Sequence, residues 1–186
     1  MYTQEQKQTL VSIARSSIQN GLHTDKPEII NLKNHDSDLQ EIRATFVTLK
    51  ISETLRGCLG TLEARYPLVK SVAEYAYAAA FRDPRFKPLC EDEFDIITLS
   101  ISILTPAEPI EFDSDAELVH QLNPGIDGLI IQSGHRSATF LPAVWESLSD
   151  AKQFLSQLKA KAQIRPDENL TAASRYKAIE ICENNI

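Results

Sequence analysis

Thr45-Phe46-Val47-Thr48-Leu49-Lys50-Ile51-Ser52-Glu53-Thr54-Leu55-Arg56-Gly57-Cys58-Leu59-Gly60-Thr61 is the stretch that decides the fold. Residues 43–51 alternate between apolar and polar side chains, which is the period of a strand with one buried face. Ser52-Glu53-Thr54 predicts a turn, and residues 55–62 predict a second strand. The stretch therefore predicts a β-hairpin.

Helices are predicted on both sides of this hairpin. Thr3 and Gln6 form the pattern of a capping box at the start of a first helix, and Gly21 predicts its end. Pro67 is suited to the first position of a second helix. That helix should end just before Pro84, because the residue preceding a proline disfavours the helical conformation.

Further strands and helices alternate irregularly along the rest of the chain. We predict a half-buried strand at 97–103, a short helix after Ser114, a strand, turn and strand over 128–141, and a helix opened by Ser149. Residues 174–182 favour one last strand, with a helix as the alternative. Because the order lacks the βαβ rhythm of a parallel sheet, we expect an α+β fold with mainly antiparallel sheet flanked by helices.

Composition excludes several classes of protein. The 186 residues carry a net charge of -7, which argues against binding nucleic acid through a broad basic face. No apolar run approaches the ~20 residues that span a bilayer, and the first residues lack the pattern of a signal peptide. We therefore expect a cytoplasmic protein that needs no membrane, with its three cysteines reduced. Residues 56–87 hold six cationic and three acidic side chains, hence a local charge of +3 that would attract an anion.

The second strand of the hairpin carries the best candidate for chemistry. Alternation places Arg56 and Cys58 on one face, where a guanidinium would favour the nucleophilic thiolate. Gly57 and Gly60 predict a bulge, or the close approach of a ligand or of another backbone segment. The alternative is that Cys58 packs as a small hydrophobic residue, which is the commoner role of a free cysteine.

A second candidate is the proline-stiffened loop that follows the second helix. Arg82 and Arg85 could hold a carboxylate or phosphate between two guanidinium groups. The alternative is structural: Asp83 closes the turn and pairs with an arginine, while the flanking phenylalanines pack. His135, in a turn containing a glycine, could act as a general base if folding brought it near Cys58; a solvated turn histidine is the competing interpretation.

Several of these segments together resemble the AMMECR family, which comprises the AMME-syndrome candidate proteins and the microbial AmmeMemoRadiSam system protein A. The resemblance runs from about residue 8 to the C-terminus and rests on residues 55–61, then Ala78-Ala79-Ala80-Phe81-Arg82-Asp83-Pro84-Arg85-Phe86, with support from 100–106, 124–131 and 140–142. It implies one domain over 1–186, with a larger lobe formed by both termini, a smaller lobe from the middle, and a cleft between them. The cleft would be lined by Arg56-Gly57-Cys58-Leu59-Gly60, and a Memo-type and a radical-SAM protein would be partners.

The chain departs from the family pattern at 158–164, where the family often has Leu-Cys-x-Lys-Ala-Gly-Leu and this chain has Leu-Lys-Ala-Lys-Ala-Gln-Ile. A redox partner for Cys58 is therefore not expected there. No spacing of a metal site and no cofactor-binding fingerprint is present, so neither a metal nor a cofactor is predicted.

Two functional hypotheses follow. In the first, the protein binds or transforms a small anionic ligand, with Cys58 as nucleophile. In the second, it is a non-catalytic interaction module. The residues leave open whether it is an enzyme.

Overall fold

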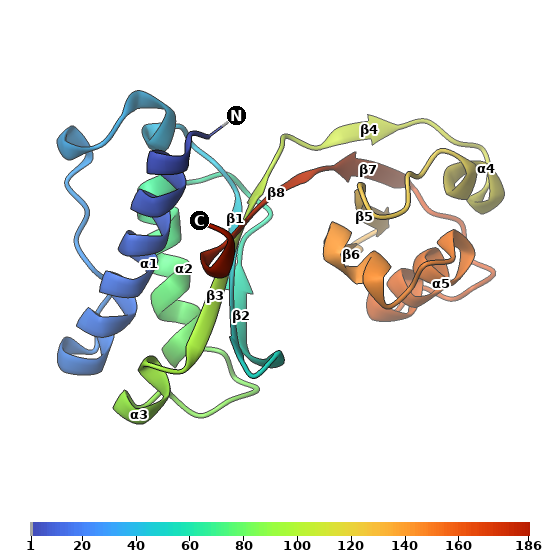
Figure 1. Cartoon of the computed structure of the whole chain (residues 1–186). Helices are drawn as coiled ribbons and strands as arrows, with labels where there is room; N and C mark the ends of the chain where they lie inside the picture. Colours follow the sequence, from blue (N-terminus) through green and yellow to red (C-terminus); the bar gives the residue numbers. More distant parts are fainter. Residues whose placement is uncertain (1) are drawn as a thin grey trace. The chain divides into compact units, whose positions relative to one another are not determined.

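The computed structural model describes residues 2–186 and divides into two compact units (Figure 1). The first unit comprises Met1–Leu104 together with Ile179–Ile186, and the second comprises Thr105–Ala178. Two four-stranded sheets with antiparallel pairing are present, in the orders β2-β1-β3-β8 and β4-β7-β5-β6. The predicted α+β class is therefore confirmed, whereas the cleft between lobes stays a prediction.

In the first unit, two long helices cover one face of the sheet (Figure 1). The core between them is formed by residues such as Leu10, Ile18, Val72, Leu49 and Ile101. The elements are α1 (Gln4–Thr24), short 3-10 helices at Leu32–Asn34 and Ser37–Gln40, β1 (Thr45–Ile51), β2 (Thr54–Gly60), α2 (Leu68–Phe81), α3 (Glu91–Phe94), β3 (Ile97–Leu104), β8 (Ala178–Cys182) and a final 3-10 helix at Glu183–Asn185.

The capping box predicted at the start of α1 is confirmed, with Thr3 as the N-cap and Gln6 at the third helical position. The predicted end at Gly21 is wrong, because α1 continues to Thr24 and is closed by Asp25 in the left-handed conformation. A Cβ on Gly21 would lie 2.4 Å from a ring carbon of Phe81. Gly21 therefore serves the close approach of α1 to α2.

The predicted hairpin is confirmed as β1 and β2. Its two turn residues, Ser52 and Glu53, both have positive φ (47° and 65°), which matches the twist of a two-residue hairpin. The register shifts within the ladder, since Leu49 faces Gly57 whereas Lys50 faces Leu55. This leaves an extra residue, Arg56, in a β-bulge.

The second unit packs helices against its own sheet. Its elements are β4 (Glu108–Ile110), α4 (Asp115–His120), β5 (Gly128–Ser133), β6 (Arg136–Phe140), a 3-10 helix at Pro142–Glu146, α5 (Ala151–Lys161) and β7 (Ala172–Tyr176). The rings of Trp145 and Phe154 stack in the core with centroids 3.7 Å apart, and the indole N–H donates to the Asp127 carbonyl at 2.7 Å.

The prediction of one last strand over 174–182 is wrong in one respect: the segment forms two strands, β7 and β8, which belong to different sheets. The chain crosses from the second unit back to the first at this point, so the ladder partners change. Within residues 2–186, no helix has both the length and the apolar character required to cross a bilayer.

Candidate functional site

The loop after α2 covers the free edge of β2. β2 is an edge strand, so the outward backbone groups of Cys58 have no strand partner. The Cys58 N–H instead donates to Asp83 Oδ2 at 2.9 Å, and Arg85 Nη2 donates to the Cys58 carbonyl at 3.2 Å. Two side chains of the loop thus satisfy the donor and the acceptor that a neighbouring strand would otherwise bind.

Asp83 organises this loop. Its side chain is 1% exposed, and its oxygens accept from the Arg85 backbone N–H at 3.1 Å, from Nε at 2.9 Å and from Nη2 at 2.6 Å. These bonds from Arg85, together with the Cys58 N–H, hold the pKa of Asp83 well below its usual range although burial opposes them. The structural interpretation of Asp83, a turn closed by its carboxylate and an ion pair with an arginine, is confirmed.

Arg56 forms a two-pronged ion pair with Glu93 of α3. Its Nε donates to Oε1 at 2.7 Å, its Nη2 donates to Oε2 at 2.8 Å, and Nη2 also donates to the Lys87 carbonyl at 3.0 Å. The pKa of Glu93 is lowered to about 2, chiefly by the hydrogen bond from Arg56. Nη1 of Arg56 is buried and has no hydrogen-bond partner within residues 2–186. The guanidinium is thus directed to Glu93, whereas the sequence analysis placed it beside the thiol.

The Cys58 thiol lies on the sheet face opposite to the helices. Cys58 pairs with Thr48, which pairs in turn with Ser100, so these three side chains form one row across the sheet. The neighbouring row, with Leu49 and Leu99, faces the core. The sulfur is half-buried and accepts a hydrogen bond from the Thr48 hydroxyl at 3.3 Å. Cys58 therefore has polar neighbours on this face.

Both glycines of the strand are required by packing. A Cβ on Gly57 would lie 2.1 Å from the Ala79 carbonyl oxygen of α2. A Cβ on Gly60 would lie 2.3 Å from the Thr45 carbonyl oxygen and 2.4 Å from a ring carbon of Phe46. Close approach of another backbone was among the predicted reasons for these glycines, and it accounts for Gly57 directly.

Arg82 does not share the partners of Arg85. Its Nη1 lies 3.8 Å from Glu74 Oε1, and its guanidinium carbon lies 4.8 Å from the centre of the Tyr77 ring. The other predicted residue, His135, is exposed in the turn between β5 and β6, in the second unit. The three cysteines are free.

A pocket that the sequence analysis missed lies at the start of α2. Its volume is about 550 Å³, and we name it the α2 pocket. It is lined by Glu28, Ile29, Ile30, Arg65, Tyr66, Lys70, Glu74 and Tyr75. The spacing of Lys70 and Glu74, four residues apart, is a signal that could have placed them on one face of α2, whereas Tyr66 lies before the helix begins. The pairing of that face with Ile29 and Ile30 has no signal in the sequence.

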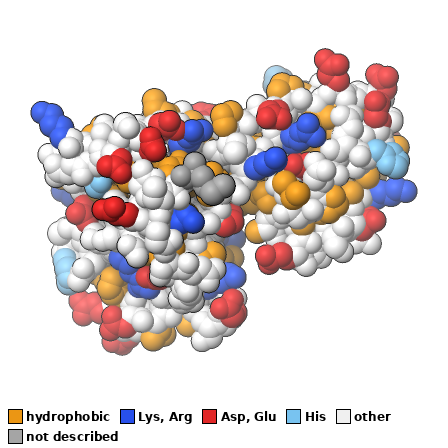
Figure 2. All heavy atoms as spheres, turned by 45° about the horizontal axis from the view of Figure 1, so that its top comes forward, with side chains coloured by type: hydrophobic (Ala, Val, Ile, Leu, Met, Phe, Trp, Pro, Cys, Tyr) orange, Lys and Arg blue, Asp and Glu red, His pale blue; other side chains and the backbone are white. Residues whose placement is uncertain are grey.

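The ion pairs of residues 56–87, the segment with the excess of cations, show which of its positive charges has no partner. Each of its four arginines is paired with a carboxylate: Arg56 with Glu93, Arg65 with Glu63, Arg82 with Glu74, and Arg85 with Asp83. Lys70 and Lys87 form no ion pair within residues 2–186. Of these two lysines, Lys70 lines the α2 pocket. On the face drawn in Figure 2, acidic and basic side chains are likewise interspersed.

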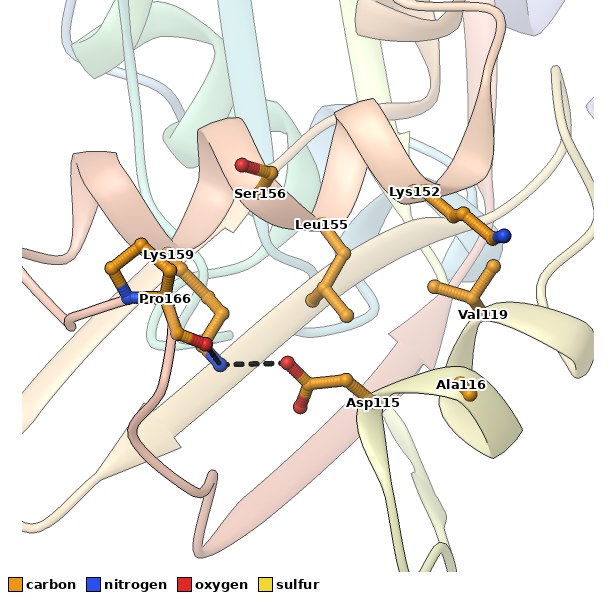
Figure 3. A pocket seen from close by; sticks show the side chains of 8 residues that line it. All are labelled: Asp115, Ala116, Val119, Lys152, Leu155, Ser156, Lys159 and Pro166. Atoms are coloured by element: carbon orange, nitrogen blue, oxygen red, sulfur yellow. Dashed lines mark hydrogen bonds and ion pairs between the residues drawn. The ribbon is translucent and has the colours of Figure 1, made fainter.

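A second pocket, of about 260 Å³, lies between α4 and α5 in the second unit (Figure 3). The Leu155 side chain lies between an ion pair of Lys159 with Asp115 on one side and Val119 on the other. Lys159 is only 4% exposed at its side chain, and its ammonium donates to Asp115 Oδ2 at 2.7 Å and to the carbonyls of Pro166 and Glu168 at 3.0 and 2.8 Å. All three N–H donors are therefore used, one to hold α4 and two to fasten the loop after α5.

Comparison with known proteins gives a consistent result. The family model described as AMMECR1 matches residues 11–181. A protein of Methanothermobacter thermautotrophicus is 38% identical over 170 residues, which cover 89% of this chain and 86% of that protein. Protein SSO0193 of Saccharolobus solfataricus is 38% identical over 175 residues, covering 90% of this chain and 76% of the relative.

Among solved structures, the crystal structure of the uncharacterized protein PH0010 from Pyrococcus horikoshii matches with a TM-score of 0.83 and 34% identity. The match covers 92% of this chain and 88% of that one. None of these names states an activity.

Proposed function

Because this chain belongs to the AMMECR1 family, we propose for it the role of binding a small anionic ligand, with the anionic group in the α2 pocket. The observation that carries the proposal is the distribution of ion pairs. Arg56 and Arg85 are each neutralised by a carboxylate, whereas Lys70, which lines the α2 pocket, forms no ion pair within residues 2–186. An anion that arrives at the α2 pocket meets an unpaired ammonium. At β2, by contrast, the same anion would have to displace Glu93 or Asp83 from its arginine.

The test uses inorganic phosphate as the probe and per-residue amide shifts in NMR spectra as the measurement. Phosphate should shift the amides around Lys70, and Lys70→Ala should weaken its binding about tenfold, the loss of one charge-assisted contact of ~1.4 kcal/mol. Lys33→Ala removes an exposed lysine elsewhere on the same unit and should change nothing. Unchanged affinity in Lys70→Ala, or shifts centred on Arg56 and Cys58, would contradict the proposal.

A second candidate function is chemistry at the Cys58 thiol. It is supported by the hydrogen bond from Thr48 to the sulfur on the helix-free face of the sheet. The hydrogen bond directs the Cys58 side chain toward Thr48 on that face. In a Cys90→Ser/Cys182→Ser background, Cys58 should react with iodoacetamide faster than glutathione does, and Thr48→Val should slow it. A rate equal to that of glutathione would leave Cys58 as a packing residue and favour the interaction-module hypothesis.

Cytoplasmic location and association with Memo-type and radical-SAM proteins remain part of this proposal. The free state of all three cysteines supports a reducing compartment. The partners rest on the family resemblance alone. Pull-down of either candidate partner by the purified chain measures this association. Substitutions on one face that weaken the pull-down would identify the interface.

A further inference from the structure

The α2 pocket combines three kinds of side chain that a bare inorganic anion would not need. Two are phenols, Tyr66 and Tyr75; two are carboxylates, Glu28 and Glu74; and Ile29 and Ile30 add an apolar wall. A volume of about 550 Å³ falls within the range of roughly 300–1,000 Å³ that small organic ligands occupy. The lining therefore matches a ligand that has an aromatic body as well as a charge.

The two phenol rings line the same pocket as the unpaired ammonium. Tyr66 and Tyr75 belong to the lining of the α2 pocket together with Lys70. Neither hydroxyl makes a hydrogen bond within residues 2–186, and Tyr66 is 50% exposed. An exposed ring such as that of Tyr66, in a pocket that also holds an unpaired ammonium, is the combination that stacks a nucleobase and holds the phosphate attached to it.

The carboxylates restrict the ligand further. Glu28 is exposed and its side chain has no ion pair within the described chain, while Glu74 uses only Oε1, at 3.8 Å, toward Arg82. Carboxylates only accept hydrogen bonds, so they repel a ligand that is anionic throughout. They favour a ligand with an amino group at a distance from its anionic group.

We infer that the ligand of the α2 pocket is a nucleoside monophosphate whose base carries an exocyclic amino group. The phosphate lies at Lys70, the base stacks on Tyr66 and Tyr75, and the amino group donates to Glu74 or Glu28. This inference rests on the proposed function, since it identifies the class of anion that the pocket binds.

The test compares five probes by isothermal titration calorimetry with the intact chain: AMP, UMP, adenosine, 4-aminobenzoate and inorganic phosphate. AMP should bind about tenfold or more tightly than phosphate, because base stacking adds to the phosphate contact. AMP should also bind more tightly than UMP, which lacks the amino group. Tyr66→Leu should remove most of the difference in affinity between AMP and phosphate without changing the affinity for phosphate. Glu74→Gln should reduce the difference in affinity between AMP and UMP.

The outcomes separate this inference from the function on which it rests. Phosphate binding that depends on Lys70, with AMP no tighter than phosphate, overturns the nucleotide assignment and leaves anion binding in place. Binding of 4-aminobenzoate as tightly as AMP also overturns it. Adenosine binding as tightly as AMP, or no probe binding at all, overturns both. Lys33→Ala is the matched lysine control, and circular dichroism verifies that Tyr66→Leu, a change at a half-exposed residue, remains folded.

Discussion

Replacing Glu93 by glutamine removes the charge that holds Arg56 beside α3. The two side chains form paired hydrogen bonds of 2.7 and 2.8 Å and are 13% and 26% exposed, so the pair is mostly withdrawn from water. The folded protein holds the pKa of Glu93 at about 2, against an ordinary value of 4.5. A folded pKa below the unfolded one means that the carboxylate stabilises the fold above about pH 4.5, and that this stability is lost as pH falls toward 2.

The size of the effect follows from the pKa difference. Lowering a pKa from 4.5 to about 2 corresponds to at most ~3 kcal/mol at neutral pH, at 1.36 kcal/mol per unit. Water reaches about a quarter of the Glu93 side chain and screens part of this, so we expect ~1–2 kcal/mol. Glu93→Gln should therefore be less stable than the parent by that amount at pH 7, and the difference should shrink between pH 5 and pH 2.5.

Urea unfolding followed by circular dichroism, at pH values from 7 to 2.5, measures the difference directly. Other carboxylates titrate in both proteins and cancel in the comparison. Glu91→Gln is the matched control, because Glu91 lies on the same short helix, is exposed and forms no ion pair in the described chain. Parallel stability curves for the parent and Glu93→Gln over the whole pH range would refute the assignment of Arg56 to a structural pair.

Two further substitutions test the packing that surrounds the candidate sites. Gly57→Ala places a methyl group 2.1 Å from the Ala79 carbonyl oxygen and should lower the free energy of unfolding in urea by roughly 2–3 kcal/mol. The control Gly134→Asn, in an open turn, should lower it by under ~1 kcal/mol. Equal losses in the two variants would show that α2 moves easily away from the added methyl group. Lys159→Met keeps an unbranched side chain but removes three hydrogen bonds, so it should lower the unfolding free energy by about 1–3 kcal/mol and expose the loop at 165–168 to proteolysis. A cleavage rate equal to that of the parent would contradict the fastening role.

Local pattern was enough to predict most elements of the fold. Alternation marked β1 and β3, the capping box marked the start of α1, and the segment before Pro84 marked the end of α2. These signals work because strand period, capping and proline geometry act between residues close in sequence. The errors at Gly21 and at the last strand share one cause: each depends on a partner distant in sequence, Phe81 in one case and a change of sheet in the other.

The candidate site divides in the same way. The sequence alone indicated which residues could carry charge or chemistry. It also indicated the excess of cations at 56–87 and the turn that Asp83 closes. Only the tertiary structure assigned Arg56 its carboxylate, because Glu93 lies 37 residues further along the chain. An ion pair depends on the positions of two side chains in space. The unpaired charge of Lys70 could therefore be identified only after the structure had shown the carboxylate that pairs with each arginine of residues 56–87.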